Sequence, residues 1–291
     1  MNNKPLFSVV TVCYNAGNLI RKTIESVIVQ NTNINFDSLY AGYDSLFEYI
    51  IQDGSSTDDT LSIVSEYQAL FNDKEISMTV KSEKDGGIYD AMNKAVRSAK
   101  GTYIIFMNAD DCFYSDHVLK DISECLSDFP DIVYGDCIIK ELGMYFKFRK
   151  CFDLIKTRMP FSHQACFAKK ELLTESPFNT DYRITADYAF LLKSFINGKS
   201  FFDSNVCIAL VTADGLSSVH MLDTFIETNK VCNDLNTPRF SNSEYVKKLH
   251  IMKIKQFVLS YFPGFIKLAI RKFQIKKRGQ LTEVIIPHWC K

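Results

Sequence analysis

Residues 82–111 read SEKDGGIYDAMNKAVRSAKGTYIIFMNADD and contain one complete helix-to-strand unit. After the Gly-Gly turn, which lets the backbone turn sharply, residues 88–98 have the apolar spacing of a helix. Gly101 is expected to end this helix, and the run YIIFM at 103–107 is typical of a buried strand. The strand runs into NADD at 108–111. The stretch predicts a helix beside a buried strand, with acidic residues at the strand's carboxyl end.

The same alternation extends toward the N-terminus. We expect strands at 7–13, 49–51 and 76–80, and helices at 19–29 and 56–70, the second capped by Ser56 or Thr57. Strands that alternate with helices indicate a parallel sheet covered by helices, so the fold class is α/β. Residues 31–47 are longer than a usual connection and are interpreted as a surface excursion.

Beyond Asp111 the pattern is looser and has α+β character. We expect a helix from Ser115, strands at 131–134 and 164–168, a hairpin-like stretch at 138–148 and a helix at 187–195. After residue 218 the sequence predicts helices, with a loop at 233–242.

Composition excludes several classes of protein. The 291 residues include 34 Lys or Arg and 34 Asp or Glu, so no overall charge indicates a nucleic-acid partner. Nine cysteines without a Cys-x-x-Cys pair fit neither a disulfide framework nor a zinc ribbon. The N-terminus does not resemble a secretion signal, and the longest apolar stretch, 256–270, falls short of the roughly 20 residues of a spanning helix. We therefore expect a cytoplasmic protein with reduced cysteines.

Three clusters of polar residues follow predicted strands, at 52–60, 82–95 and 108–111. Ligands of open α/β sheets bind at the carboxyl ends of strands. Asp53 directly follows its strand and could accept hydrogen bonds from a ligand, whereas Asp58 and Asp59 are typical of helix capping. The adjacent carboxylates Asp110 and Asp111 repel one another unless a cation such as Mg²⁺ or Mn²⁺ lies between them, the alternative being a solvated turn.

Together these clusters resemble glycosyltransferase family 2, whose nucleotide-sugar domain has the GT-A fold. The resemblance is carried by TVCYN (11–15), DGSSTDDT (53–60), DGGIYDAMNK (85–94), NADD (108–111), PFSHQ (160–164) and ITADY (184–188). It covers about residues 6–217 and implies a mixed sheet flanked by helices. It also implies a nucleotide-sugar half at 1–112, an acceptor half at 113–217 and a helical extension at 218–291.

The resemblance also implies residue roles. Asp53 would bind the nucleotide base, the loop of Asp85 would close its pocket, and Asp111 with Asp110 would hold Mn²⁺ or Mg²⁺. The remaining donor-site candidates by position are Thr11, Asn15, Asn93 and His163. Asp187 matches the general base. His163 could instead be an interior histidine, and His220 is a weaker candidate for a late metal ligand. Asn108 stands where the family often has Asp.

The implied reaction is an inverting transfer from a nucleoside diphosphate donor, by preference a UDP-sugar. The sugar would be a hexosyl or N-acetylhexosaminyl group, and the acceptor a glycan or a lipid-linked hydroxyl in surface polysaccharide assembly. A catalytically silent carbohydrate-binding partner subunit is the alternative, against which the five carboxylates at loop ends argue. A dehydrogenase is disfavoured because no G-x-G-x-x-G is present, and a nucleotidyltransferase because no basic Gly-rich loop follows the first strand.

The C-terminal tail concentrates positive charge. Ten Lys or Arg and no Asp or Glu lie between Lys247 and Arg278, which leaves residues 1–246 with 23 basic and 33 acidic residues. Apolar and aromatic residues alternate with these charges from 251 to 278, a pattern that suits an anionic membrane surface. We expect peripheral contact with the inner face of the cell membrane. Packing of the tail on the acidic body is the alternative.

Overall fold

The computed structural model describes residues 4–32, 40, 42–213, 220–263, 266, 269–270, 272–273 and 287–290. Its strands are β1 (Pro5–Cys13), β2 (Ser45–Asp53), β3 (Met78–Ser82), β4 (Tyr103–Phe106), β5 (Cys112–Phe113), β6 (Ile132–Glu141), β7 (Met144–Lys147), β8 (Cys166–Lys169) and β9 (Phe201–Thr212). Its α-helices are α1 (Gly17–Ile28), α2 (Thr60–Asp73), α3 (Ile88–Ser98), α4 (Val118–Glu124), α5 (Lys170–Glu175), α6 (Ala186–Ile196), α8 (Met221–Asp234) and α9 (Asn242–Ser260). Short 3₁₀ turns are η1 (Phe152–Leu154), η2 (His163–Ala165) and η3 (His288–Cys290).

The strands form one mixed sheet in the order β3-β2-β1-β4-β8-β6-β9-β5, with β7 paired to β6. β1 pairs in parallel with β2 and β4, and β2 with β3, whereas β8 runs antiparallel to β4 and β6. The register places Cys13 beside Asp53 and Asp53 beside Ser82. The carboxyl ends of the four parallel strands therefore lie along one edge of the sheet, as the sequence predicts.

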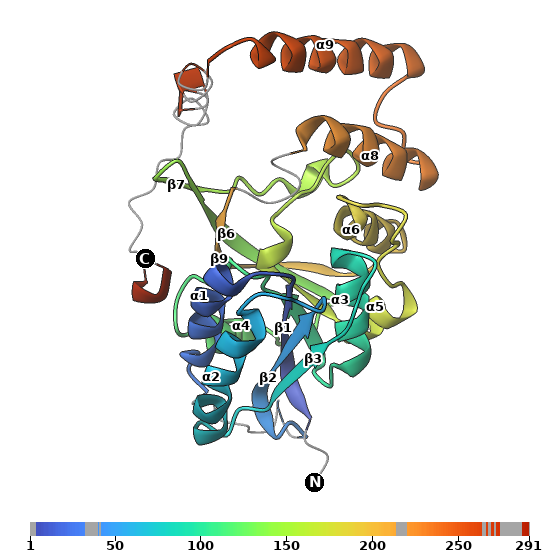
Figure 1. The fold of residues 1–291 in the computed structure, drawn as a ribbon. Helices are drawn as coiled ribbons and strands as arrows, with labels where there is room; N and C mark the ends of the chain where they lie inside the picture. Colours follow the sequence, from blue (N-terminus) through green and yellow to red (C-terminus); the bar gives the residue numbers. More distant parts are fainter. Residues whose placement is uncertain are drawn as a thin grey trace.

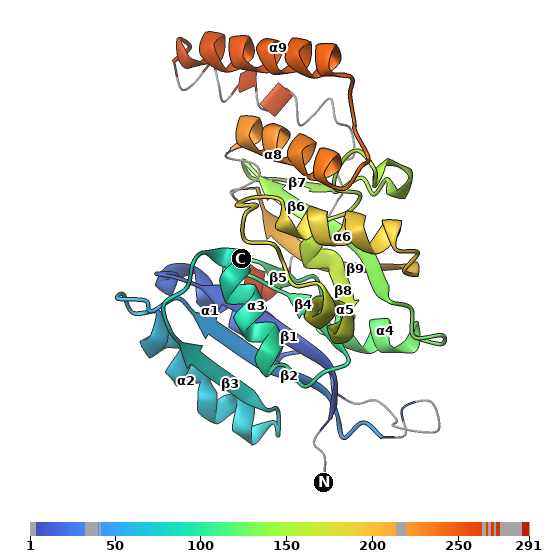
Figure 2. The same ribbon diagram turned by 90° about the vertical axis from the view of Figure 1, so that its right-hand side faces the viewer.

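Helices cover both faces of the sheet, as Figures 1 and 2 show. α1, α2 and α4 share one apolar core with the sheet, and α3, α5, α6 and α8 share the other. Side chains of a strand alternate between the two faces, so Phe7 and Val9 of β1 enter the first core while Val10 and Val12 enter the second. Both cores are needed because a parallel sheet is apolar on both faces.

Most predicted elements of the first half are present, and α3 spans the predicted residues. The predicted cap of the second helix is wrong. α2 begins at Thr60, because the Ser56 hydroxyl bonds to Asp53 and the Thr57 backbone N–H donates to Asn15. In the second half the sequence did not predict β5 or β9, and Gln164 lies in η2 ahead of β8.

Gly101 has a role other than the predicted helix end. α3 ends at Ser98, and its C-cap residue Ala99 is already extended. The Gly101 N–H donates to the Ser8 hydroxyl at 2.9 Å and to the buried carboxylate of Glu48 at 3.2 Å. A Cβ at Gly101 would lie 2.5 Å from the Ser8 nitrogen, so glycine is required for this close approach to β1.

The predicted surface excursion at 31–47 falls partly outside the described residues, which omit 33–39 and 41. Its end belongs to the body. Tyr40 is buried and packs edge-on against Phe129 with ring centroids 6.2 Å apart, and β2 already begins at Ser45.

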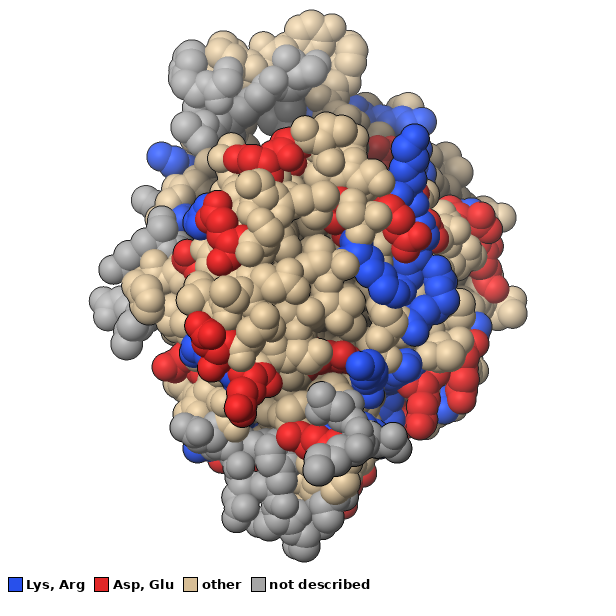
Figure 3. Space-filling view, turned by 60° about the horizontal axis from the view of Figure 1, so that its bottom comes forward, with Lys and Arg blue, Asp and Glu red and all other residues tan. Residues whose placement is uncertain are grey.

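α8 and α9 differ in how they join the body. Val231 and Cys232 of α8 are fully buried in the second core. α9 lies beyond α8 in both ribbon views, and its Tyr245 ring stacks on Phe225 of α8 at 5.8 Å. No helix in the described part of the chain is both long and apolar enough to cross a membrane. Figure 3 shows acidic clusters and a stripe of Lys and Arg side by side on one face of the molecule, on the side where α3 and α5 lie in Figure 1.

Candidate active site

Four of the predicted site residues lie at the end of β2 or in the loops after β1 and β4, namely Asn15, Asp53, Asp110 and Asp111. Asn15, Ser55 and Asp110, in the loops after β1, β2 and β4, have φ values of +48°, +66° and +85°. Non-glycine residues rarely adopt this left-handed conformation, which costs about 1–3 kcal/mol each and concentrates at functional sites. Other non-glycine residues with positive φ occur elsewhere in the described chain, but these three share one edge of the sheet with the predicted site residues.

Asp53 is fully buried at the end of β2 and organises its own loop. Its Oδ2 accepts hydrogen bonds from the Ser56 N–H at 2.9 Å and the Ser82 hydroxyl at 2.6 Å, while Oδ1 accepts from the Ser56 hydroxyl. These bonds tie the loop after β2 to the end of β3. Its contact with a nucleotide base remains a prediction.

The neighbouring loops meet at Gly54. A Cβ at Gly54 would lie 2.7 Å from Asp85 Oδ2, and Asp85 Oδ1 accepts the Gly87 N–H at 2.9 Å. Asn15 Oδ1 accepts the Thr57 N–H at 2.9 Å on the same side. Tyr14, which the sequence analysis did not single out, is 64% exposed and lies next to Gly54. An exposed aromatic ring beside Asp85 is suited to stack on a nucleotide base.

Thr11 and Asn93 have partners inside the protein. The buried Thr11 hydroxyl donates to the Met107 carbonyl at 2.7 Å and lies 2.9 Å from the Tyr49 hydroxyl. The Asn93 side chain bonds both the carbonyl and the N–H of Phe178, at 2.8 and 2.9 Å. The structure therefore does not bring these two side chains together with the loop residues above.

Asp110 and Asp111 have different surroundings. Asp110 forms an ion pair with Lys22 of α1, and its Oδ2 accepts the Thr212 hydroxyl of β9 at 2.5 Å. Asp111 is buried and accepts one side-chain hydrogen bond, from Gln164 Nε2 at 3.1 Å. Burial raises the pKa of Asp111 to about 7, because a carboxylate without a cationic partner is costly inside a protein.

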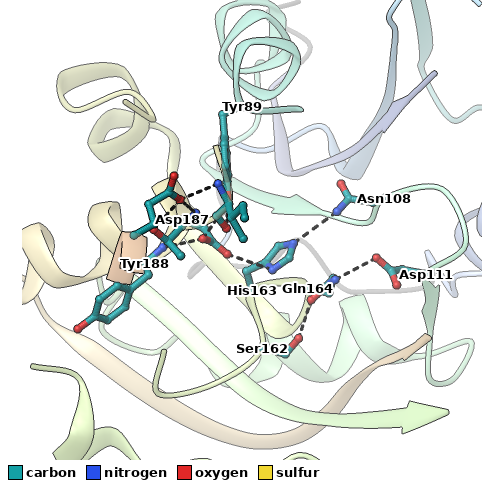
Figure 4. Close-up of polar contacts among 11 residues, drawn as sticks. Tyr89, Asn108, Asp111, Ser162, His163, Gln164, Asp187 and Tyr188 are labelled. Carbon is teal, nitrogen blue, oxygen red and sulfur yellow. Dashed lines mark hydrogen bonds and ion pairs between the residues drawn. The ribbon is translucent and has the colours of Figure 1, made fainter. Parts of the chain in front are cut away.

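A chain of polar contacts leads from Asp187 to Asn108 (Figure 4). Asp187 Oδ2 lies 3.2 Å from His163 Nδ1, and His163 Nε2 lies 3.4 Å from the Asn108 amide nitrogen. With the Asn108 NH₂ group toward Nε2, a neutral His163 has its proton on Nδ1 and donates it to Asp187. Burial lowers the pKa of His163, which favours this neutral form. His163 thus links the acceptor half to the loop after β4.

Asp187 is the second residue of α6 and receives further hydrogen bonds. Its Oδ1 accepts the Tyr89 hydroxyl at 3.0 Å and the Tyr188 N–H at 2.8 Å. Its side chain is 16% exposed, so the carboxylate still reaches solvent. This arrangement holds a carboxylate in a fixed position where it can take a proton from a bound molecule.

The oxygen atoms of Asn108 and Asp111, in the loop at the end of these polar contacts, are suited to a divalent metal ion. Asn108 Oδ1 is buried and has no hydrogen-bond partner among the described residues, and Asp111 is the uncompensated carboxylate next to it in the loop. Mg²⁺ is usually held by one or two carboxylates together with substrate phosphates, so a complete protein cage is not required. Such a cage is not found among the described side chains, which hold no metal-binding group of three or more His, Cys, Asp or Glu.

His220 lies elsewhere. It is half exposed and pairs with Asp223 across 3.4 Å at the start of α8. Residues 214–219, which precede it, lie outside the described residues, and its role as a metal ligand remains a prediction.

The structure adds partners that the sequence analysis missed. Gln164 and Tyr89 belong to motifs that it quoted, PFSHQ (160–164) and DGGIYDAMNK (85–94), so their place in these motifs was a usable signal. Lys22 and Thr212 belong to no motif, and only the packing of α1 and β9 brings them to Asp110.

Comparison with known proteins gives a consistent result. Residues 8–189 match the family described as Glycosyl transferase family 2. The chain is 30% identical over 198 residues to a PGL/p-HBAD biosynthesis glycosyltransferase of Mycobacterium bovis, which covers 66% of this chain and 71% of the relative. It is 35% identical over 121 residues to TuaG of Bacillus subtilis, a putative teichuronic acid biosynthesis glycosyltransferase, covering 42% of each chain.

Solved structures share the fold. S. aureus TarS 1-349 in complex with UDP has a TM-score of 0.59 at 19% identity, over 82% of this chain and 68% of that one. The mannosyltransferase PcManGT from Pyrobaculum calidifontis, in complex with GDP-Man and Mn²⁺, has a TM-score of 0.59 at 18% identity, over 85% and 68%.

Proposed function

The chain belongs to glycosyltransferase family 2 and has the GT-A type of fold, and on this premise we propose that it catalyses an inverting transfer from a nucleoside diphosphate sugar to an acceptor hydroxyl. The observation that carries the proposal is the contact chain Asp187–His163–Asn108, which joins a fixed carboxylate to the loop of Asp110 and Asp111. An inverting displacement needs a base on one side of the sugar and charge stabilisation for the leaving group on the other.

In this proposal the donor lies across the carboxyl ends of β1 to β4. Tyr14, Asn15, Asp53 and Asp85 surround the place of the base, and Asp111 with Asp110 and Asn108 would hold Mn²⁺ or Mg²⁺. The ion, when bound, neutralises the negative charge that develops on the diphosphate. Lys22, already paired with Asp110, adds a second positive charge at the same loop.

Asp187 takes the proton of the acceptor hydroxyl as that oxygen attacks the anomeric carbon. His163 and Tyr89 keep the carboxylate oriented by donating to Oδ2 and Oδ1.

The relatives support a choice of donor and acceptor classes. TarS was solved with UDP, and the M. bovis and B. subtilis relatives are named for PGL/p-HBAD and teichuronic acid biosynthesis. We therefore favour a UDP-hexose or UDP-N-acetylhexosamine donor and a glycan or lipid-linked acceptor, in surface polysaccharide assembly at the cytoplasmic face of the membrane. The exposed face of α9 would rest on anionic lipid, because its Val246, Ile254 and Phe257 are 62%, 50% and 62% exposed among lysines.

A thermal-shift screen of nucleotide-sugars with and without Mn²⁺ tests the donor. A ligand that binds only the folded state raises the melting temperature, and 100-fold excess over its dissociation constant adds about 2.7 kcal/mol. We expect one donor to stabilise the protein strongly with Mn²⁺, and to be transferred or slowly hydrolysed. Stabilisation without any turnover would favour the silent partner subunit instead.

A further inference from the structure

One carboxylate of α8 binds the loop that leads into the helix of Asp187. Glu227 Oε1 accepts the Arg183 N–H at 2.8 Å. Its Oε2 accepts the N–H groups of Ile184 and Thr185, both at 2.7 Å, and the Thr185 hydroxyl at 2.9 Å. Three consecutive backbone N–H groups therefore donate hydrogen bonds to a single side chain.

The same loop is held from its other side by α3. The Tyr89 hydroxyl donates to the Ile184 carbonyl at 2.7 Å and to Asp187 Oδ1 at 3.0 Å. Thr185 precedes the first residue of α6, and its side chain makes no cap within its own helix. The loop that ends two residues before Asp187 is thus held between Tyr89 of α3 and Glu227 of α8.

The charge of Glu227 is part of this arrangement. Within the described residues Glu227 forms no ion pair, and its partners are the backbone N–H groups of residues 183–185, just ahead of α6, and the Thr185 hydroxyl. A helix N-terminus carries partial positive charge, and hydrogen bonds to a carboxylate are stronger than those to a neutral acceptor. A glutamine has the same shape but one acceptor oxygen fewer, and its NH₂ group would face a backbone N–H.

We infer that Glu227 is a positioning residue of the transfer reaction, which holds Asp187 in place through the loop 183–185. The inference rests on the proposed role of Asp187 as the base. The family match ends at residue 189, so this contact comes from a part of the chain beyond it. α8 then belongs to the active-site architecture, and the helical extension contributes to turnover without touching substrate.

The test uses full-length Glu227→Gln and Glu227→Ala, with Asp223→Asn as a matched loss of one negative charge on α8. Donor affinity is measured by titration with Mn²⁺ and the best donor from the thermal-shift screen, and transfer by initial rates. We expect kcat to fall roughly 10–100-fold with donor affinity unchanged, since a shift of about 1 Å at a catalytic group costs up to about 100-fold. Asp223→Asn should match the wild type. The glutamine variant keeps the test usable if the alanine variant does not fold.

A double-mutant cycle with Asp187→Asn separates positioning from general loosening of the fold. If Glu227 acts through Asp187, adding Glu227→Gln to Asp187→Asn changes kcat little further. The inference is overturned if the losses of kcat in the two single variants multiply in the double variant, or if Glu227→Gln alone keeps the full kcat. Either result leaves the proposed role of Asp187 as the base intact. Wild-type kcat in Asp187→Asn alone overturns the proposed base, and the inference falls with it.

Discussion

Asp110 and Asp111 are neighbours in sequence but have different interaction partners. Asp110 already has the ammonium group of Lys22 and the hydroxyl of Thr212, whereas Asp111 is buried with one amide partner. A bound cation would therefore stabilise the carboxylate of Asp111 more than that of Asp110. The pKa of Asp111 is raised because its burial is not offset by a close positive charge. Asp110 contributes by keeping Lys22 and the loop in place.

We predict that Asp111→Asn or Asp110→Asn weakens Mn²⁺-dependent donor binding by at least about 10-fold, because a carboxamide lacks the charge that holds a divalent cation. Calorimetric titration of the donor, with Mn²⁺ and with a chelator, measures the effect. Binding in the chelator should be the same in variant and wild type. Full Mn²⁺-dependent binding in both variants would refute the metal assignment.

Asp187→Asn is predicted to leave donor binding nearly intact and to reduce transfer by roughly 10²–10⁴-fold, the usual contribution of a positioned general base. The amide oxygen can still accept from Tyr89 and from the Tyr188 N–H, and the NH₂ group can donate to His163 Nδ1 in the other histidine tautomer, so the fold should survive. Donor titration beside initial-rate measurements checks the split. An equal loss of binding and turnover would show that Asp187 has a structural role.

At the scale of elements, the connection from α3 to β4 explains how the sheet accommodates a buried charge. The Glu48 carboxylate on β2 is 3% exposed and accepts the Ser8 hydroxyl at 2.7 Å and the backbone N–H groups of Lys100 and Gly101 at 2.5 and 3.2 Å. A buried carboxylate is tolerated when its oxygens are bonded in this way. The connection must therefore approach β1 and β2 closely.

Gly101→Ala is predicted to lower the free energy of unfolding by roughly 1–3 kcal/mol, because the new methyl group would overlap the backbone of β1. Urea unfolding followed by circular dichroism measures the change. Gly86→Ala serves as the control, since its Cβ would meet nothing closer than 3.7 Å. Equal stability of the two variants would contradict the close approach described here.

Seen as a whole molecule, the chain separates an acidic body from a basic tail. α9 contacts the body through α8, and its Lys253, Lys255 and Phe257 are exposed. Each Lys or Arg near an anionic lipid surface contributes about 1 kcal/mol, so several of them together with apolar side chains suffice for reversible adsorption. Five of the basic residues of the predicted tail, 267, 271 and 276–278, lie outside the described residues.

We predict that reversal of Lys253, Lys255 and Lys272 to Glu, or truncation after Phe240, releases the protein from vesicles that contain anionic lipid. Co-sedimentation at rising salt checks this, because the Debye length falls from about 10 Å at 0.1 M to about 3 Å at 1 M. Reversal of Lys74, Lys100 and Lys193 on the body is the matched control. Absence of vesicle binding by the intact chain at low salt would end the membrane proposal.

The α/β class, the family and the loops proposed to carry the site were predictable from the sequence because those signals are local. Strand and helix periodicity is read within about ten residues, and parallel strands bring their carboxyl ends to one edge whatever the details of packing. Asp53, Asp85 and Asp111 could be proposed as site residues because they lie in the polar clusters that follow predicted strands.

Which side chains contact these residues depends on the tertiary structure. Lys22 meets Asp110 across 88 positions, Tyr89 meets Asp187 across 98, and Glu227 meets Thr185 across 42. Such contacts depend on how α1, α3 and α8 pack on the sheet, and no local pattern encodes a packing partner. The same reason explains why β9 was missed and why Thr11 and Asn93, which stand within motifs, have internal partners. Their hydrogen-bonding groups face the core, a direction set by the packing of neighbouring elements.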